Sequence, residues 1–141
     1  MNCSLESRGP VRAYHVLAVD DDPNSTELTR IALESAGPYV VREVNDPKVA
    51  VDTATEFGPD LIIMDVDMPR LDGRAAALLM QCKDSLKDVP ILFLTSMIPE
   101  TAGGNPFGWF GPLTKPVTPK RLASAVENIL RDGTIGEPSL S

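Results

Sequence analysis

Five short strand-like runs alternate with helix-like segments along the chain, and this alternation constrains the fold more than any other feature. The runs lie at residues 14–19, 39–44, 61–64, 89–94 and 111–114. Residues 61–64 form a continuous apolar run between turn signals, which is typical of a strand buried on both faces. Strands that alternate with helices favour a parallel sheet with right-handed crossovers. We therefore predict an α/β fold.

Three of the intervening segments, and the segment after the last run, carry mostly apolar residues at helical spacing. Each set predicts one face of a helix. The sets are Leu28, Ile31, Ala32 and Ser35; Val49, Ala50, Ala54 and Phe57; Ala75, Leu78, Leu79, Cys82 and Leu86; and Leu122, Ala125, Val126, Ile129 and Leu130. The segment before the fifth strand differs, because prolines and glycines interrupt residues 96–111. An interior glycine costs a helix about 1 kcal/mol and a proline about 3 kcal/mol, so we expect this helix to be short or absent.

The composition indicates a single globular domain in the cytoplasm. A length of 141 residues suits one domain, which we place at residues 13–131, between a flexible lead at 1–12 and a tail at 132–141. The net charge of −7 argues against a nucleic-acid surface. Neither a signal peptide nor an apolar run long enough for a membrane span is evident.

Polar side chains follow the predicted strands. Asp20, Asp21 and Asp22 follow the first strand, Asp65 follows the third, Thr95 the fourth and Lys115 the fifth. The carboxyl ends of parallel strands meet at one edge of a sheet, where ligands bind. Crowded carboxylates need a cation, and oxygen ligands without His or Cys favour Mg²⁺. A solvated turn with a helix cap is the simpler alternative for the aspartates, and a surface charge is the simpler alternative for Lys115.

The order of these motifs closely resembles response-regulator receiver domains over about residues 14–131. The segments that carry the resemblance are Val19-Asp20-Asp21-Asp22-Pro23, residues 60–69 with Asp72-Gly73, Leu94-Thr95-Ser96 and Thr114-Lys115-Pro116. The resemblance implies a flavodoxin-like, doubly wound sheet of five parallel strands in the order 2-1-3-4-5. It also implies a phosphoacceptor of two-component signalling or a phosphorelay, supplied by a histidine kinase or a histidine phosphotransfer protein.

The resemblance assigns a role to each residue at the strand ends. Asp65 would accept the phosphoryl group, and Thr95 and Lys115 would contact its oxygens. Asp20, Asp21 and Asp65 would hold Mg²⁺, together with the backbone carbonyl of Asp67. Such a protein catalyses only its own phosphorylation and dephosphorylation, and we expect it to signal through contacts with an unidentified downstream protein.

One position departs from the family pattern. Pro112 stands three residues before Lys115, where receiver domains usually carry an aromatic side chain that rotates on phosphorylation. A receiver-like binding module that does not use phosphate is therefore an alternative. A second alternative takes Asp65-Val66-Asp67 as the nucleophile motif of haloacid-dehalogenase-like phosphatases, although there the nucleophile lies on the first strand.

Overall fold

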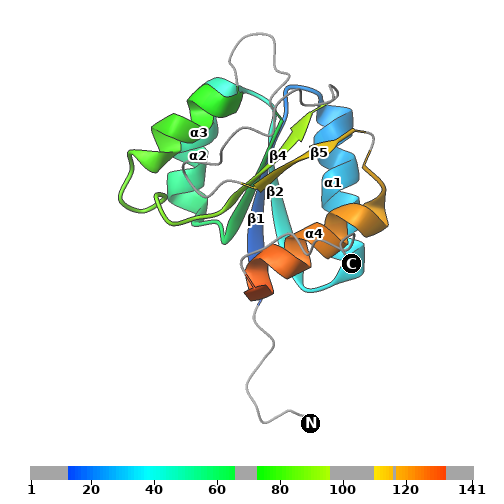
Figure 1. Cartoon of the computed structure of the whole chain (residues 1–141). Coiled ribbons are helices and arrows are strands. Elements are labelled where there is room, and N and C mark those ends of the chain that lie inside the picture. Colours follow the sequence, from blue (N-terminus) through cyan, green and yellow to red (C-terminus); the bar gives the residue numbers. More distant parts are fainter. Residues whose placement is uncertain (1–12, 66–72, 96–109, 116, 133–141) are drawn as a thin grey trace.

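Five parallel strands form a single sheet in the order β2-β1-β3-β4-β5, seen in Figure 1. The computed structural model describes residues 13–65, 73–95, 110–115 and 117–132. The strands are β1 Tyr14–Val19, β2 Tyr39–Val44, β3 Leu61–Asp65, β4 Ile91–Thr95 and β5 Phe110–Thr114. The predicted α/β class and the strand order implied by the resemblance are confirmed.

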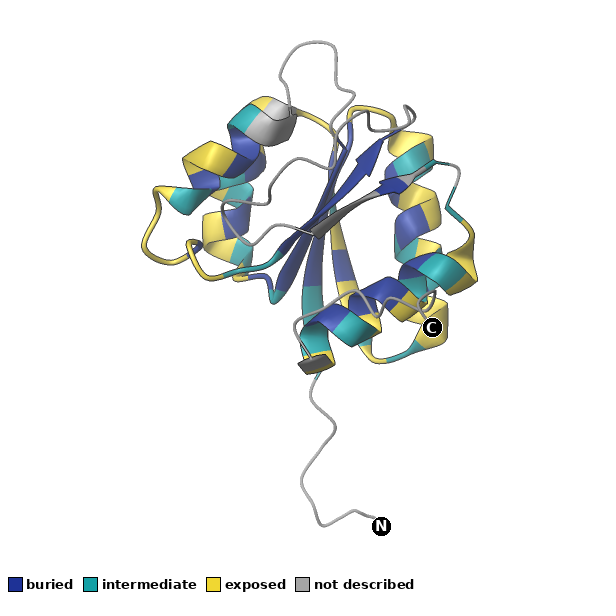
Figure 2. Ribbon diagram, in the orientation of Figure 1, coloured by how far each residue is buried: buried dark blue, intermediate teal, exposed yellow. Residues whose placement is uncertain are grey.

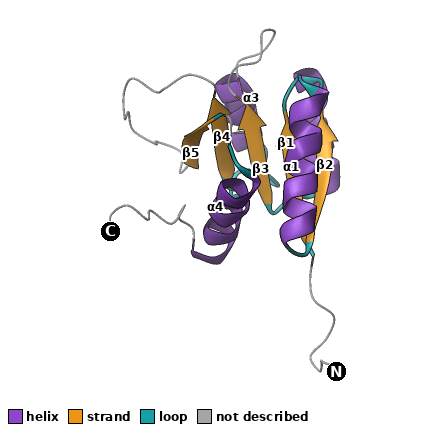
Figure 3. Ribbon diagram, turned by 90° about the vertical axis from the view of Figure 1, so that its right-hand side faces the viewer, coloured by secondary structure: helices purple, strands orange, loops and turns teal. Residues whose placement is uncertain are grey.

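Helices cover both faces of the sheet. They are α1 Pro23–Ala36, α2 Ala50–Phe57, α3 Gly73–Gln81 and α4 Pro119–Asp132, with a 3₁₀ turn, η1 Pro47–Val49, before α2. Helices α1 and α4 pack together on one face, in front of the strands in Figure 3, while α2 and α3 lie on the other face (Figure 1). The expected lead, the residues after 132 and the interrupted segment 96–109 lie outside the described residues, so their predictions stay untested. No helix among the described residues has the length and hydropathy that a transmembrane span needs.

The sheet separates two hydrophobic cores. Successive side chains of a strand point to opposite faces, so Leu17 and Val19 enter the core under α2 and α3, while Val16 and Ala18 enter the other core. Every residue of β3 and β4 is buried (Figure 2), which explains why their sequences are apolar up to the terminal Asp65 and Thr95. The predicted buried face of α4 is also confirmed, since four of its five apolar residues are buried and Leu130 is partly buried.

The predicted face of α1 is wrong. Leu28 and Ile31 are 67% and 47% exposed, whereas Thr26, Thr29 and Leu33 are the buried residues of this helix. Periodicity counts apolar side chains, but here two threonines face inward. The Thr26 hydroxyl finds polar partners at the end of the sheet, including Glu43 on β2 at 2.8 Å, so its burial leaves no hydrogen bond unmade.

The predicted face of α3 is wrong in the same way. Leu78 and Leu79 are 44% and 55% exposed, while Ala76, Ala77 and Met80 are buried against the sheet. Both faces of α3 carry apolar side chains, so periodicity alone does not indicate which of them turns to the sheet. Helix α3 also ends at Gln81, earlier than predicted, and the predicted Leu86 is buried from the turn that follows. In the set predicted for α2, Ala50 and Ala54 are buried and Phe57 partly so, but Val49 is exposed.

Candidate functional site

The register between β1 and β3 brings two aspartates to one edge of the sheet. Val19 pairs with Met64 at the carboxyl ends of these strands. Asp20 and Asp65 each come next in the chain, so they leave the sheet side by side. Both are almost fully buried, at 4% and 3% exposure. Two buried carboxylates that lie side by side repel each other and require a compensating cation.

A register shift in β5 aligns the last strand with the same edge. Leu92 of β4 pairs with Phe110 of β5, and Leu94 pairs with Leu113. Between these two pairs, one residue of β4 stands against residues 111–112 of β5, which is the pattern of a β-bulge. Strand β5 lies at the edge of the sheet, where the backbone can accept Pro112 without losing an interior hydrogen bond. After the bulge, Thr95 pairs with Thr114, and Lys115 follows directly. The bulge thus decides which β5 residue leaves the strand beside β4.

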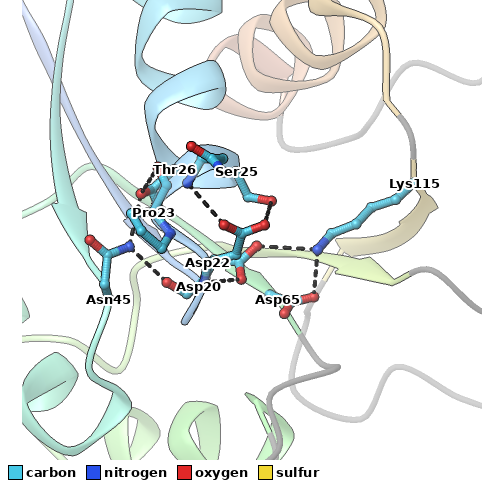
Figure 4. Close-up of polar contacts among 9 residues, drawn as sticks. Asp20, Asp22, Pro23, Ser25, Thr26, Asn45, Asp65 and Lys115 are labelled. Atoms are coloured by element: carbon cyan, nitrogen blue, oxygen red, sulfur yellow. Dashed lines mark hydrogen bonds and ion pairs between the residues drawn. The ribbon is translucent and has the colours of Figure 1, made fainter.

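Lys115 supplies the cation that the two aspartates require. Its Nζ lies 3.1 Å from Asp20 Oδ2 and 3.0 Å from Asp65 Oδ1, as Figure 4 shows. Its backbone N–H donates to the carbonyl of Thr95 at 2.7 Å, which ties β5 to β4 at the site. Burial by itself lowers the pKa of Lys115, but its contacts with Asp65 and Asp20 outweigh that effect and raise the pKa above its ordinary value.

Asp20 is held from three directions. Its backbone N–H donates to the Val44 carbonyl at 3.0 Å, which extends the pairing of β1 with β2. Its carboxylate Oδ1 accepts the backbone N–H of Asp22 at 3.0 Å, and its carbonyl accepts the side-chain amide of Asn45 at 2.8 Å. Asp22 is itself the N-cap of α1, since its side chain accepts from the N–H of Asn24. The turn after β1 is therefore rigidly attached to both α1 and β2.

The donor set at this edge fits a hard divalent cation. Carboxylate oxygens of Asp20, Asp21 and Asp65 all lie within 4.8 Å of one another. Among the described residues, three carboxylates face one ammonium group, so a divalent ion would balance the remaining charge of the cluster. Asp21 is exposed, which leaves this side of the cluster open to solvent. Oxygen-only coordination suits Mg²⁺.

Most of the sequence-predicted site residues are brought together. Asp20, Asp21, Asp65 and Lys115 form one cluster, and Thr95 is 5% exposed at the end of the neighbouring strand β4. Asp67 lies outside the described residues. Asn45 is the residue that sequence reasoning missed. Its location was predictable, because Asn45 directly follows β2 and β2 ends at the same edge as the acidic strands, but its hydrogen-bond partner was not.

A family model described as "Response regulator receiver domain" matches residues 16–127. Among curated proteins, the DNA-binding dual master transcriptional regulator RpaA of Synechocystis sp. is 32% identical over 82% of this chain and 48% of its own length. The sensor protein GacS of Pseudomonas syringae is 35% identical over 82% of this chain and 13% of its own length. The chain therefore spans about half, or less, of these relatives.

Solved structures of similar size share the fold. The chemotaxis protein CheY4 of Vibrio cholerae superposes with a TM-score of 0.76 at 30% identity, covering 84% of this chain and 99% of that chain. A response regulator from Chloroflexus aurantiacus superposes with a TM-score of 0.75 at 32% identity, covering 84% of this chain and 98% of that chain. In both cases nearly the whole of the solved chain superposes on this domain.

Proposed function

Because this chain belongs to the family of response regulator receiver domains, we propose that it accepts a phosphoryl group on Asp65. The donor is a phosphohistidine of a histidine kinase or a histidine phosphotransfer protein, and the phosphorylated chain signals by protein contacts in the cytoplasm. One observation carries the proposal: a buried carboxylate, Asp65, lies against the ammonium group of Lys115 and beside two further carboxylates. That arrangement suits a nucleophile that must accept an anionic group.

The proposed reaction is an in-line transfer between two nucleophiles. A carboxylate oxygen of Asp65 forms a bond to phosphorus while the phosphorus–nitrogen bond of phosphohistidine breaks, and the imidazole leaves with the bonding electron pair. The Lys115 ammonium neutralises charge on the phosphoryl oxygens, and the Thr95 hydroxyl donates a hydrogen bond to one of them. Lys115 already lies 3.0 Å from Asp65, so it is close to the point where this charge develops.

Asp20, Asp21 and Asp65 would hold Mg²⁺ through carboxylate oxygens, with the backbone carbonyl of Asp67 as a further ligand. When bound, the ion supplies charge neutralisation at the transferring group, which lets a carboxylate attack despite its anionic surroundings. The fixed position of Asp20, through its bonds to Val44 and Asp22, favours this role, because preformed ligands lose little freedom on binding.

An apolar groove beside the site suits the phosphodonor protein. The groove between α1 and α4 is lined by Leu28, Ile31 and Leu122, and it extends to Lys115. Leu28 and Ile31 are large apolar side chains that are about half or more exposed, at 67% and 47%. A donor imidazole must come within bonding distance of Asp65, so its carrier must cover the surface around Lys115. We infer that the donor docks an apolar face in this groove.

The direct test is intact mass spectrometry after incubation with Mg²⁺ and acetyl phosphate. We expect one phosphoryl group on the parent chain and none on Asp65→Asn. Asp52→Asn, which removes an exposed carboxylate from α2, serves as the matched control and should behave as the parent. A parent chain that stays unmodified, or a phosphoryl group that persists on Asp65→Asn, would refute the assignment.

A further inference from the structure

A continuous chain of side-chain hydrogen bonds connects the turn after β1 with the outer face of α1. Asn45 Nδ2 donates to the carbonyl of Asp20 at 2.8 Å and to Thr26 Oγ1 at 2.9 Å (Figure 4). The Thr26 hydroxyl donates to Glu43 Oε1 at 2.8 Å, and Arg30 Nε donates to Glu43 Oε2 at 2.7 Å. These hydrogen bonds therefore join the end of β1, the end of β2 and the first turns of α1.

In this series of hydrogen bonds, each donor faces an acceptor, and the assignment of the two is unambiguous. The Asp20 carbonyl can only accept, so the amide nitrogen of Asn45, not its oxygen, must face it. Thr26 has one hydroxyl proton, and its 2.8 Å contact with Glu43 is shorter than its 3.2 Å contact with a backbone carbonyl of its own helix. The hydrogen bond from Arg30 lowers the pKa of Glu43, which keeps that carboxylate ionised as an acceptor.

The first hydrogen bond of this series, from Asn45 to the Asp20 carbonyl, lies next to the proposed metal ligand Asp21. The Asp20 carbonyl belongs to the peptide group that joins Asp20 to Asp21, so its orientation sets the direction in which the Asp21 side chain leaves the backbone. Asp20 has other restraints on its N–H and carboxylate. Asp21 makes no side-chain hydrogen bond within the described part of the chain and is exposed. The amide of Asn45 therefore restrains the peptide group before Asp21, while the hydrogen bond from the Asp22 N–H to Asp20 Oδ1 restrains the peptide group after it.

We propose that Asn45 is a positioning residue for the cation site: by holding the Asp20–Asp21 peptide group against Thr26, it aims the Asp21 carboxylate at the cluster of Asp20 and Asp65. This inference rests on the proposed function, because it takes the cluster as the Mg²⁺ site. Asn45 itself is not a ligand. Residues that orient metal ligands in this way commonly contribute about tenfold to a hundredfold to metal affinity.

The test is Mg²⁺ affinity, measured by isothermal titration calorimetry on the folded chain, beside stability in urea with EDTA. We expect Asn45→Ala to weaken Mg²⁺ binding about tenfold or more. Thr26→Val removes only the hydroxyl and should weaken binding less, because the Asn45 amide keeps its bond to Asp20. Asn24→Ala is the matched control, since it removes an exposed amide from the first turn of α1 whose side chain makes no hydrogen bond in the described structure.

The two possible failures are distinguishable. If the parent binds Mg²⁺ and Asn45→Ala binds it equally well at temperatures where both are folded, Asn45 has only a structural role and the inference is wrong. A loss of stability in urea without a loss of affinity leads to the same conclusion. If the parent chain binds no Mg²⁺ at all, the proposed function fails together with the inference. Should Asn45→Ala not fold, Thr26→Val takes its place: a loss of Mg²⁺ affinity smaller than about tenfold supports the inference, and an affinity equal to that of the parent refutes it.

Discussion

Removing the Lys115 ammonium is expected to destabilise the chain without metal and to make its stability depend on Mg²⁺. In Lys115→Met, the apolar stem is retained, but the carboxylates of Asp20 and Asp65 lose the cation that lies 3.1 and 3.0 Å away. Both carboxylates are buried, at 4% and 3% exposure. Removing one partner of a buried ion pair lowers the free energy of unfolding by about 3–5 kcal/mol. Because the Lys115 side chain is 24% exposed, water can replace part of the contact, and we expect about 3 kcal/mol.

Urea denaturation in EDTA measures this loss, and titration with Mg²⁺ measures its reversal. The ion and Lys115 share the carboxylates of Asp20 and Asp65, so the variant should bind Mg²⁺ more tightly than the parent and gain more stability from it by mass action. Lys120→Met, an exposed lysine at the start of α4, is the control and should change neither quantity. Equal stability of Lys115→Met and the parent in EDTA, or the same Mg²⁺ response in both, would refute the electrostatic reasoning.

Two further predictions concern the donor groove and the acid limit of stability. Leu28→Asn should slow phosphorylation about tenfold when the donor is a histidine kinase that phosphorylates the parent, as expected for an apolar contact residue. The same substitution should leave labelling by acetyl phosphate unchanged. Leu79→Asn alters an exposed leucine on the opposite face of the sheet and should affect neither, so equal effects of the two would exclude this groove. Because Arg30 lowers the pKa of Glu43 below 4.5, this carboxylate adds stability above pH 4.5 that is lost as pH falls through its lower folded pKa. Glu43→Gln should therefore be less stable than the parent at pH 7, with the difference vanishing in acid unfolding experiments; a difference that persists in acid would contradict this.

The amino-acid sequence by itself determined the fold and most of the site. Strands β3 and β4 are apolar up to their last residues, Asp65 and Thr95, because both faces of the sheet are covered, and such runs are visible without any structure. Chemistry at the carboxyl edge follows from topology alone, since parallel strands end together. Asp20, Asp65 and Lys115 could therefore be assigned to one cluster from their places at the strand ends, and the structure places Lys115 Nζ within 3.1 Å of both carboxylates.

Tertiary structure decided which helix faces are buried. In α1 the apolar Leu28 is exposed and the polar Thr26 is buried, because Thr26 finds hydrogen-bond partners from β2 and from Asn45. Periodicity reports where apolar side chains recur, but it contains no information on partners from distant elements. In α3 the buried face carries Ala76, Ala77 and Met80, while Leu78 and Leu79 are exposed, and the spacing of apolar side chains alone does not distinguish these two faces.

The role that we propose for Asn45 also depends on tertiary structure. Nothing in the residues next to Asn45 links it to Asp20, which lies 25 positions earlier in the chain. The link arises because β1 and β2 pair in parallel, so that the residues after both strands meet at the acidic edge. A residue whose chemistry is acidic or basic reveals a site by its type, whereas a neutral amide gains its role only from the group that it faces.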